Sequence, residues 1–121
     1  MPRKPRQQRS RATVDAIVEA GFICVAELGI TGTTTRHIAE RAGISVGSLY
    51  EYFSNKQAIY EAMNQRMVTD VVAMIQPLLP QLMRMDITEA VHTLLGQFSN
   101  FLRKDDERYL KCARQAIRVD I

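Results

Sequence analysis

Residues 43–56 read GISVGSLYEYFSNK, and small side chains stand where a helix would begin. A helix whose N-terminal end carries only small side chains can come close to another surface, because no bulky side chain holds its backbone away. Ser45 and Ser48 could hydrogen-bond to bases or phosphates. Gly47 permits close approach, and Val46 could contact a thymine methyl group. These residues predict contact with base edges in the major groove of double-stranded DNA.

Larger polar side chains follow in the same stretch and could bind the phosphates of that DNA. The hydroxyls of Tyr50 and Tyr52 can donate to phosphate oxygens. Lys56 stands where the next helix begins, and a cation there opposes the helix dipole unless an anion binds nearby. Three residues at the start of the preceding helix could act similarly: Thr34, Thr35 and Arg36. Two plainer alternatives stay open, namely a core role for Tyr50 and a solvated surface position for Lys56.

The spacing of Ala39, Gly43 and Leu49 predicts the elements that position these side chains. Alanine lets a second helix approach, glycine makes a tight turn, and leucine packs back between the two helices. This spacing is typical of a helix-turn-helix, with helices at residues 34–42 and 45–53. The predicted motif core comprises Ile38, Ala39, Gly43, Leu49 and Phe53. Such a unit can also be a plain packing motif, which the spacing alone does not exclude.

Hydrophobic residues recur at helical spacing through almost the whole chain. They predict an all-α fold with further helices at residues 13–28, 56–75, 87–103 and 105–119 and with no strand. Gly21 interrupts the first of these helices at a cost of roughly 1 kcal/mol relative to alanine. A residue that small indicates close packing by another helix.

Charge is unevenly distributed along the 121 residues, whose formal net charge is +3. Five of the 16 basic side chains and none of the 13 acidic ones fall in residues 1–11, so the rest of the chain is net negative. We expect residues 1–12 to form a basic flexible arm. The arm could lie against a polyanion or act only as a solubilising tail.

Other kinds of site have little support in the sequence. Cys24 and Cys112 lack metal or disulfide spacing, and His37 and His92 have no partner at metal-ligand spacing. We therefore expect no metal, no cofactor and no enzyme activity, since no catalytic constellation is visible either. No apolar run approaches the ~20 residues that span a bilayer, and no signal-peptide segment is present. We expect a cytoplasmic protein, associated with the bacterial nucleoid, without a membrane partner.

The stretch TTTRHIAERAGISVGSLYEYFSNKQAIYEAM closely resembles the DNA-binding segment of TetR-family transcriptional regulators, and the resemblance covers about residues 13–63. It implies a three-helix DNA-binding domain at residues 13–56 and the first part of a helical ligand-binding and dimerisation domain at 57–121. It also implies a homodimer that represses from a palindromic operator until an unknown small-molecule effector releases it. The family's DNA contacts fall on Thr34, Thr35, Arg36, Ser45, Val46, Gly47, Ser48, Tyr50, Tyr52 and Lys56. Many relatives carry lysine in place of Val46, which suggests a different base preference.

The chain is shorter than typical family members, so we expect only part of the effector-binding domain and none of the usual dimer helices, whether the sequence is a fragment or the gene product is short. An alternative function is a truncated interaction protein that pairs with a full-length relative and modulates its DNA binding. Adaptable methionine and aromatic side chains could line an effector pocket, although they could equally be ordinary core. The candidates for this pocket are Met63, Met67, Met74, Phe98 and Phe101.

Overall fold

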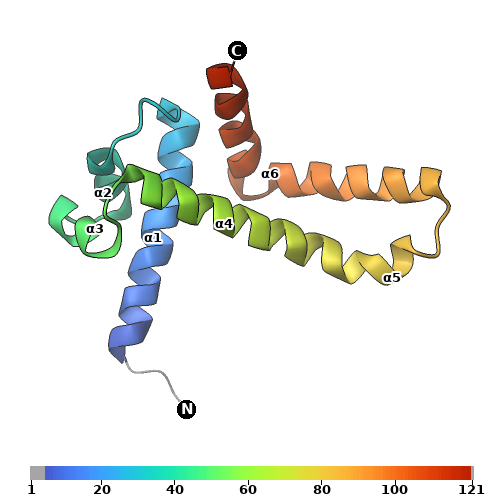
Figure 1. The fold of residues 1–121 in the computed structure, drawn as a ribbon, viewed down its shortest axis with the longest axis horizontal. Coiled ribbons are helices and arrows are strands. Elements are labelled where there is room, and N and C mark those ends of the chain that lie inside the picture. Colours follow the sequence, from blue (N-terminus) through green and yellow to red (C-terminus); the bar gives the residue numbers. More distant parts are fainter. Residues whose placement is uncertain (1–4, 121) are drawn as a thin grey trace.

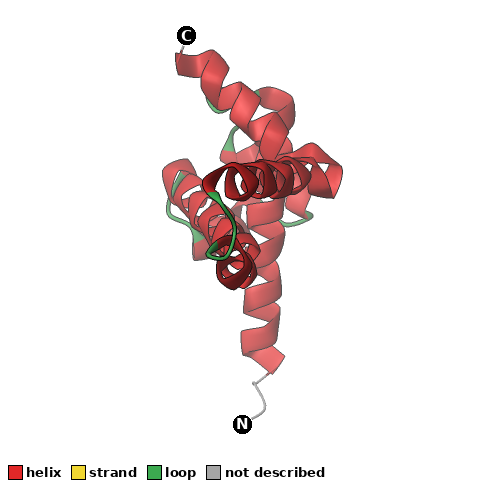
Figure 2. Cartoon of the chain, turned by 90° about the vertical axis from the view of Figure 1, so that its right-hand side faces the viewer, coloured by secondary structure: helices red, strands yellow, loops and turns green. Residues whose placement is uncertain are grey.

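The chain folds into helices joined by short connections (Figure 1), and Figure 2 shows no strand in the described part. The computed structural model describes the backbone of residues 5–120 and the side chains of residues 6–117. The elements are α1 (Pro5–Leu28), α2 (Thr35–Ala42), α3 (Val46–Tyr52), α4 (Lys56–Ile75), the 3-10 turn η1 (Gln76–Leu78), α5 (Leu79–Leu82) and α6 (Ile87–Asp120). The predicted all-α class is confirmed.

Helix α1 begins earlier than the sequence pattern predicted. Pro5 is its first residue, a position where the fixed φ of proline suits a helix and its missing N–H needs no partner. The arginines and glutamines that follow are good helix formers. Residues 5–12 of the expected flexible arm are thus helical in the structure, and residues 1–4 lie outside the described part.

Polar caps and one glycine define the helix-turn-helix. Thr34, Ser45 and Asn55 start α2, α3 and α4, each accepting a hydrogen bond from the backbone N–H three residues on. Between α2 and α3, Gly43 adopts φ 78°, a left-handed conformation that glycine takes without strain. The predicted motif is confirmed, and its helices start and end within one residue of the expected bounds.

Helices α1, α2, α3 and the first turns of α4 form a unit, here called the head, whose core lies between them. Ile38, Ala39 and Leu49 are buried, Phe53 packs partly buried against them, and Gly43 is exposed at the turn. Other buried residues come from α1 and α4: Ile17, Val18, Ala20, Phe22, Cys24, Val25, Ile59 and Met63. Burial of apolar area drives this packing. Because α4 supplies core residues, the head extends beyond the predicted boundary at residue 56.

Gly21 allows α1 and α4 to pack closely. A Cβ built on Gly21 would lie 2.6 Å from Sδ of Met63 and 3.4 Å from Cγ2 of Ile59. No Cβ tolerates the shorter of these distances unless a neighbour moves, so the glycine permits the observed helix separation. The prediction of a closely packed helix at this position is confirmed.

Helix α6 is broken in the middle. Lys104 has extended backbone angles, and Asp105, Asp106 and Glu107 have φ values of 52–59°. The first half of α6 lies along the outer part of α4, and the second half turns back toward α1 (Figure 1). The prediction of two helices meeting near residue 105 therefore describes the backbone well.

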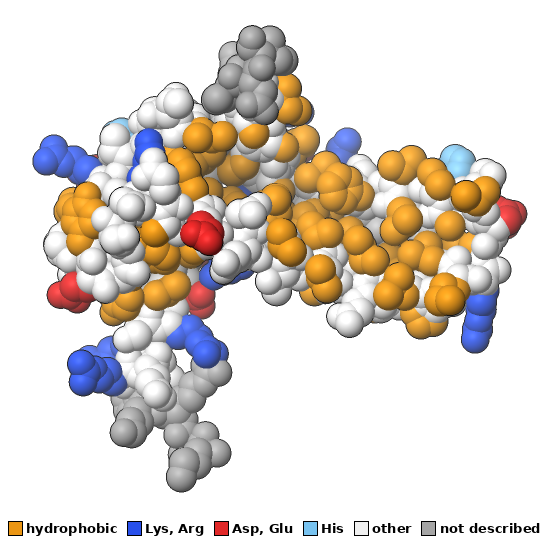
Figure 3. Space-filling model, in the orientation of Figure 1, with side chains coloured by type: hydrophobic (Ala, Val, Ile, Leu, Met, Phe, Trp, Pro, Cys, Tyr) orange, Lys and Arg blue, Asp and Glu red, His pale blue; other side chains and the backbone are white. Residues whose placement is uncertain are grey.

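The outer parts of α4 and α6, with α5 at their far end, project from the head. This helical projection is here called the arm and is distinct from residues 1–12. Large hydrophobic side chains lie exposed along this arm, including Val72, Leu79, Ile87, Val91 and Leu95 (Figure 3). None of the described helices is long and apolar enough to cross a membrane.

Candidate nucleic-acid interface

The leading end of α3 is open on one side. Ser45 and Gly47 are exposed, and the Oγ of Ser45 donates to Oγ of Ser48 at 3.0 Å while it accepts from the Ser48 N–H at 3.0 Å. A Cβ on Gly47 would meet only Ser45 Oγ, at 3.9 Å, so the fold itself does not require glycine there. Val46 is partly buried against the core, which leaves only part of its side chain for another molecule. A flat surface could therefore approach the backbone of α3 at this end.

A hydrogen bond joins the start of α2 to the middle of α3. The side-chain oxygens of Thr35 and Tyr50 lie 2.9 Å apart. Tyr50 is 48% exposed, so a core role for this residue is not what the structure shows. Tyr52 is also exposed at 37%. The structure thus presents both tyrosines at the surface, one of them fixed in orientation by Thr35.

The N-terminus of α2 is built around a reciprocal cap. Thr34 Oγ1 accepts from the His37 N–H at 3.1 Å, and Nδ1 of His37 accepts from the Thr34 N–H at 3.1 Å. Sequence reasoning missed this role of His37. The available signal was the position of His37 three residues after a threonine N-cap. Glutamate or glutamine at that position usually completes a capping box. Arg36 is exposed beside this cap, with its guanidinium available to an anion.

Lys56 has a partner within the chain. Its Nζ donates to the Thr33 carbonyl at 2.9 Å and lies 5.6 Å from the centre of the Tyr60 ring. One turn later, the Tyr60 hydroxyl donates to the Ile30 carbonyl at 2.6 Å, and burial raises the pKa of Tyr60. These contacts hold the loop between α1 and α2 onto α4. An ammonium has three donors, so this bond leaves Lys56 able to bind a phosphate as well.

The five candidate effector-pocket residues do not line one cavity. Met63 and Met67 face a hollow of about 460 Å³ between α1, α4 and the second half of α6. Met74 and Phe101 face a different hollow of about 350 Å³, and Phe98 is 44% exposed. Met74 lies on nearly the same side of α4 as Met63 but 11 residues on, which is roughly 16 Å along the helix. The candidate residues are thus divided between two hollows and the exposed surface.

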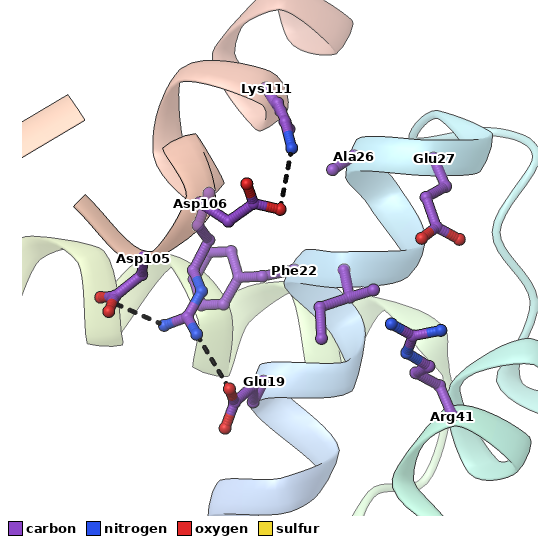
Figure 4. Close-up of a pocket in the computed structure, with 10 residues that line it drawn as sticks. Glu19, Phe22, Ala26, Glu27, Arg41, Asp105, Asp106 and Lys111 are labelled. Carbon is purple, nitrogen blue, oxygen red and sulfur yellow. Dashed lines mark hydrogen bonds and ion pairs between the residues drawn. The ribbon is translucent and has the colours of Figure 1, made fainter. Parts of the chain in front are cut away.

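Ionic contacts join α1 to the other helices at a junction that the sequence pattern did not reveal. Arg108 contacts Glu19 at 3.0 Å and Asp105 at 4.0 Å, and Arg66 contacts Asp15 at 2.7 Å. Figure 4 shows Asp105 and Glu19 on either side of the arginine that joins them, and Asp106 beside Lys111. Glu27 and Arg41 lie farther along α1 and on α2. Contacts between residues so far apart in sequence leave no local signature.

Comparison with known proteins identifies the helical head. Residues 11–63 match the family model described as bacterial regulatory proteins, tetR family. The helical head is therefore similar to the DNA-binding segment of the TetR family. TetR-family proteins are DNA-binding transcriptional regulators rather than enzymes, and this chain carries the family's DNA-binding segment. No group of three or more metal-ligating side chains occurs among the residues that the structure describes.

Curated proteins are similar to about half of the chain. The tetracycline repressor protein class C of Escherichia coli is 34% identical over 55 residues, which are 46% of this chain and 25% of that protein. The nucleoid occlusion factor SlmA of Haemophilus ducreyi is 30% identical over 66 residues, 54% of this chain and 31% of that protein. The matched segment therefore spans only about a quarter to a third of these relatives.

Two solved structures share the fold over nearly the whole chain. A TetR-family regulator from Mesorhizobium loti superposes with a TM-score of 0.72 at 22% identity, covering 91% of this chain and 54% of that one. The fatty acid degradation regulator FadR of Bacillus halodurans gives 0.63 at 21% identity, covering 99% and 61%. The fold of this chain, including α4 and both halves of α6, is thus similar to that of the two solved structures, of which it covers 54% and 61%.

Proposed function

We propose that this protein binds a specific DNA sequence through α3 and represses transcription from it. The observation that carries the proposal is the exposed leading end of α3, where Gly47 leaves the backbone open. Beside it, Tyr50 is held at the surface by Thr35. A helix placed this way can enter the major groove with its N-terminal residues toward the bases.

The proposed contacts divide into two groups. Ser45, Val46, Gly47 and Ser48 face the bases. Thr34, Thr35, Arg36, Tyr50, Tyr52 and Lys56 bind phosphates, helped by the N-termini of α2 and α4. If about 6 phosphates are neutralised, a plot of log affinity against log salt concentration should have a slope of about −5.

Two finer parts of the proposal come from the family resemblance. We propose that the protein acts as a homodimer on a palindromic operator, and that a small effector releases it. The interaction-protein alternative is not favoured, because residues 11–63 match the model of a DNA-binding regulator family. The exposed apolar arm remains a surface on which a second chain could pack.

The decisive experiment is selection of binding sites from random DNA at near-physiological salt, followed by sequencing of the retained fragments. A palindrome with half-sites about one helical turn apart would support a dimer, and a single half-site would support the reading helix alone. Arg36→Ala should weaken binding to the selected site, whereas the matched change Arg103→Ala, in an exposed arginine of α6, should not. The absence of any enriched sequence from a folded protein would contradict the proposal.

A further inference from the structure

The 460 Å³ hollow described above, here called the junction hollow, lies where the head meets the second half of α6. Phe22 and Val25 reach it from α1, Tyr60 and Met63 from α4, and Ala116 from α6. Its volume lies in the range of small-molecule pockets. None of the proposed DNA contacts lines it.

Three of the four polar side chains in the wall of the junction hollow have partners within the chain, and the fourth, the amide of Asn64, is exposed. The Tyr60 hydroxyl donates to a backbone carbonyl at 2.6 Å, and the Tyr109 hydroxyl donates to the Asp70 carboxylate at 2.5 Å. The thiol of Cys112 donates to a backbone carbonyl at 3.4 Å. None of the described lining residues carries a charge. A charged ligand would lose its hydration here without compensation, whereas an apolar neutral one would not.

The remaining wall is able to adapt to an occupant. Met63 and Met67 have flexible, polarisable side chains, which suit apolar molecules of varied shape. Opposite them, Ala113 and Ala116 are small and leave the space open.

The junction hollow also touches the part of α4 that positions the head. Tyr60 lines the hollow with its ring and holds the Ile30 carbonyl with its hydroxyl. One turn earlier, Lys56 holds the Thr33 carbonyl, immediately before the cap of α2. An occupant that displaces the Tyr60 ring therefore acts on the loop that leads into the helix-turn-helix.

We infer that the junction hollow binds a small neutral molecule made mostly of apolar groups, and that its occupancy changes DNA affinity through Tyr60. The second half of this inference rests on the proposed function. The binding itself does not, because it can be measured without DNA.

The test uses the whole 121-residue chain and three probes that share one alkyl chain: 1-octanol, octanoate and octyltrimethylammonium. Calorimetry should show that octanol binds at least tenfold more tightly than either charged probe. Ala116→Phe fills the hollow and should weaken octanol binding at least tenfold. The matched control Ala73→Phe, at an exposed position of α4, should bind octanol like the parent. Circular dichroism establishes that both variants are folded.

A second measurement tests the link to DNA. Octanol should change the affinity of the parent for its selected DNA site at least threefold, whereas Tyr60→Phe should bind octanol and show no such change. Three results would overturn the proposed site: no octanol binding, unaltered octanol binding by folded Ala116→Phe, or tighter binding of a charged probe. Octanol binding without any effect on DNA affinity would overturn the regulatory half. Failure to bind DNA in the absence of octanol would instead count against the proposed function.

Discussion

Thr35 at the first turn of α2 and Tyr50 in the middle of α3 place their side-chain oxygens 2.9 Å apart. The bond crosses the turn of the motif and fixes the direction of a tyrosine that is otherwise half exposed. An oriented hydroxyl loses less freedom on binding a phosphate than a freely rotating side chain does. The relationship thus connects the local fold of the motif with its proposed DNA contact.

Tyr50→Phe should lower DNA affinity about fivefold, which corresponds to the ~1 kcal/mol of one hydrogen bond. The free energy of unfolding should change by less than about 1 kcal/mol, because the lost bond is exposed. Affinity by fluorescence anisotropy and stability by urea unfolding check both statements. In a double-mutant cycle with Thr35→Val, the two changes should be non-additive in affinity. Simple additivity would show that Thr35 does not orient Tyr50.

Gly47→Ala should change stability and DNA affinity in opposite directions. The fold has room for the methyl group, and alanine is favoured over glycine inside a helix by up to about 1 kcal/mol. The same methyl group would stand between α3 and the base edges, so affinity should fall at least tenfold. Gly96→Ala is the matched control, since its added Cβ meets nothing within 4 Å and lies on the arm. That control should be stabilised without any loss of affinity.

Tyr109→Phe should destabilise the protein by about 1–3 kcal/mol. Tyr109 is buried, and its hydroxyl is 2.5 Å from Asp70, so the variant leaves a carboxylate without its donor. Burial and this bond raise the pKa of Tyr109 well above its ordinary value. Urea unfolding measures the loss. The double variant with Asp70→Ala should lose less than the sum of the two single changes, and a full sum would mean that the pair is not coupled.

Stability should fall as the pH rises from about 9 to 11, partly because of Cys112. Burial raises the pKa of its thiol from 9.0 to about 11, so the unfolded chain releases this proton first. The contribution is complete below pH 9 and is lost as the pH passes through the folded value. Urea unfolding at pH 7, 9, 10 and 11 should show a shallower decline for Cys112→Ala. Some decline should remain, since burial also raises the pKa of Cys24. Identical pH profiles for the two proteins would refute this assignment.

Features set by neighbouring residues were predictable from the sequence. The helix-turn-helix follows from Ala39, Gly43 and Leu49, whose roles depend on spacing within eleven residues. The close approach at Gly21 is indicated locally by a missing side chain. The break near Asp105 is indicated locally by a cluster of acidic residues.

Features that join distant segments could not be predicted in this way. Lys56 reaches the carbonyl of Thr33, 23 residues away, and no pattern in either segment indicates this contact. The supposed effector residues Met63 and Met74 share a helical face, but only the path of α6 shows that they face different hollows. The helical start at Pro5 was masked by a basic composition that is typical of flexible tails.

The two bonds from α4 to the loop before α2 have a mechanical consequence. Lys56 and Tyr60 are four residues apart, so they lie on the same side of α4. Their hydrogen bonds attach the loop to α4 at two points. One point of attachment would act as a pivot, whereas two fix an orientation. Rotation of α4 about its own axis would strain both bonds at once. We therefore expect the loop and α2 to turn together with α4, so that torque applied far out on the arm would reach the surface that we propose contacts DNA.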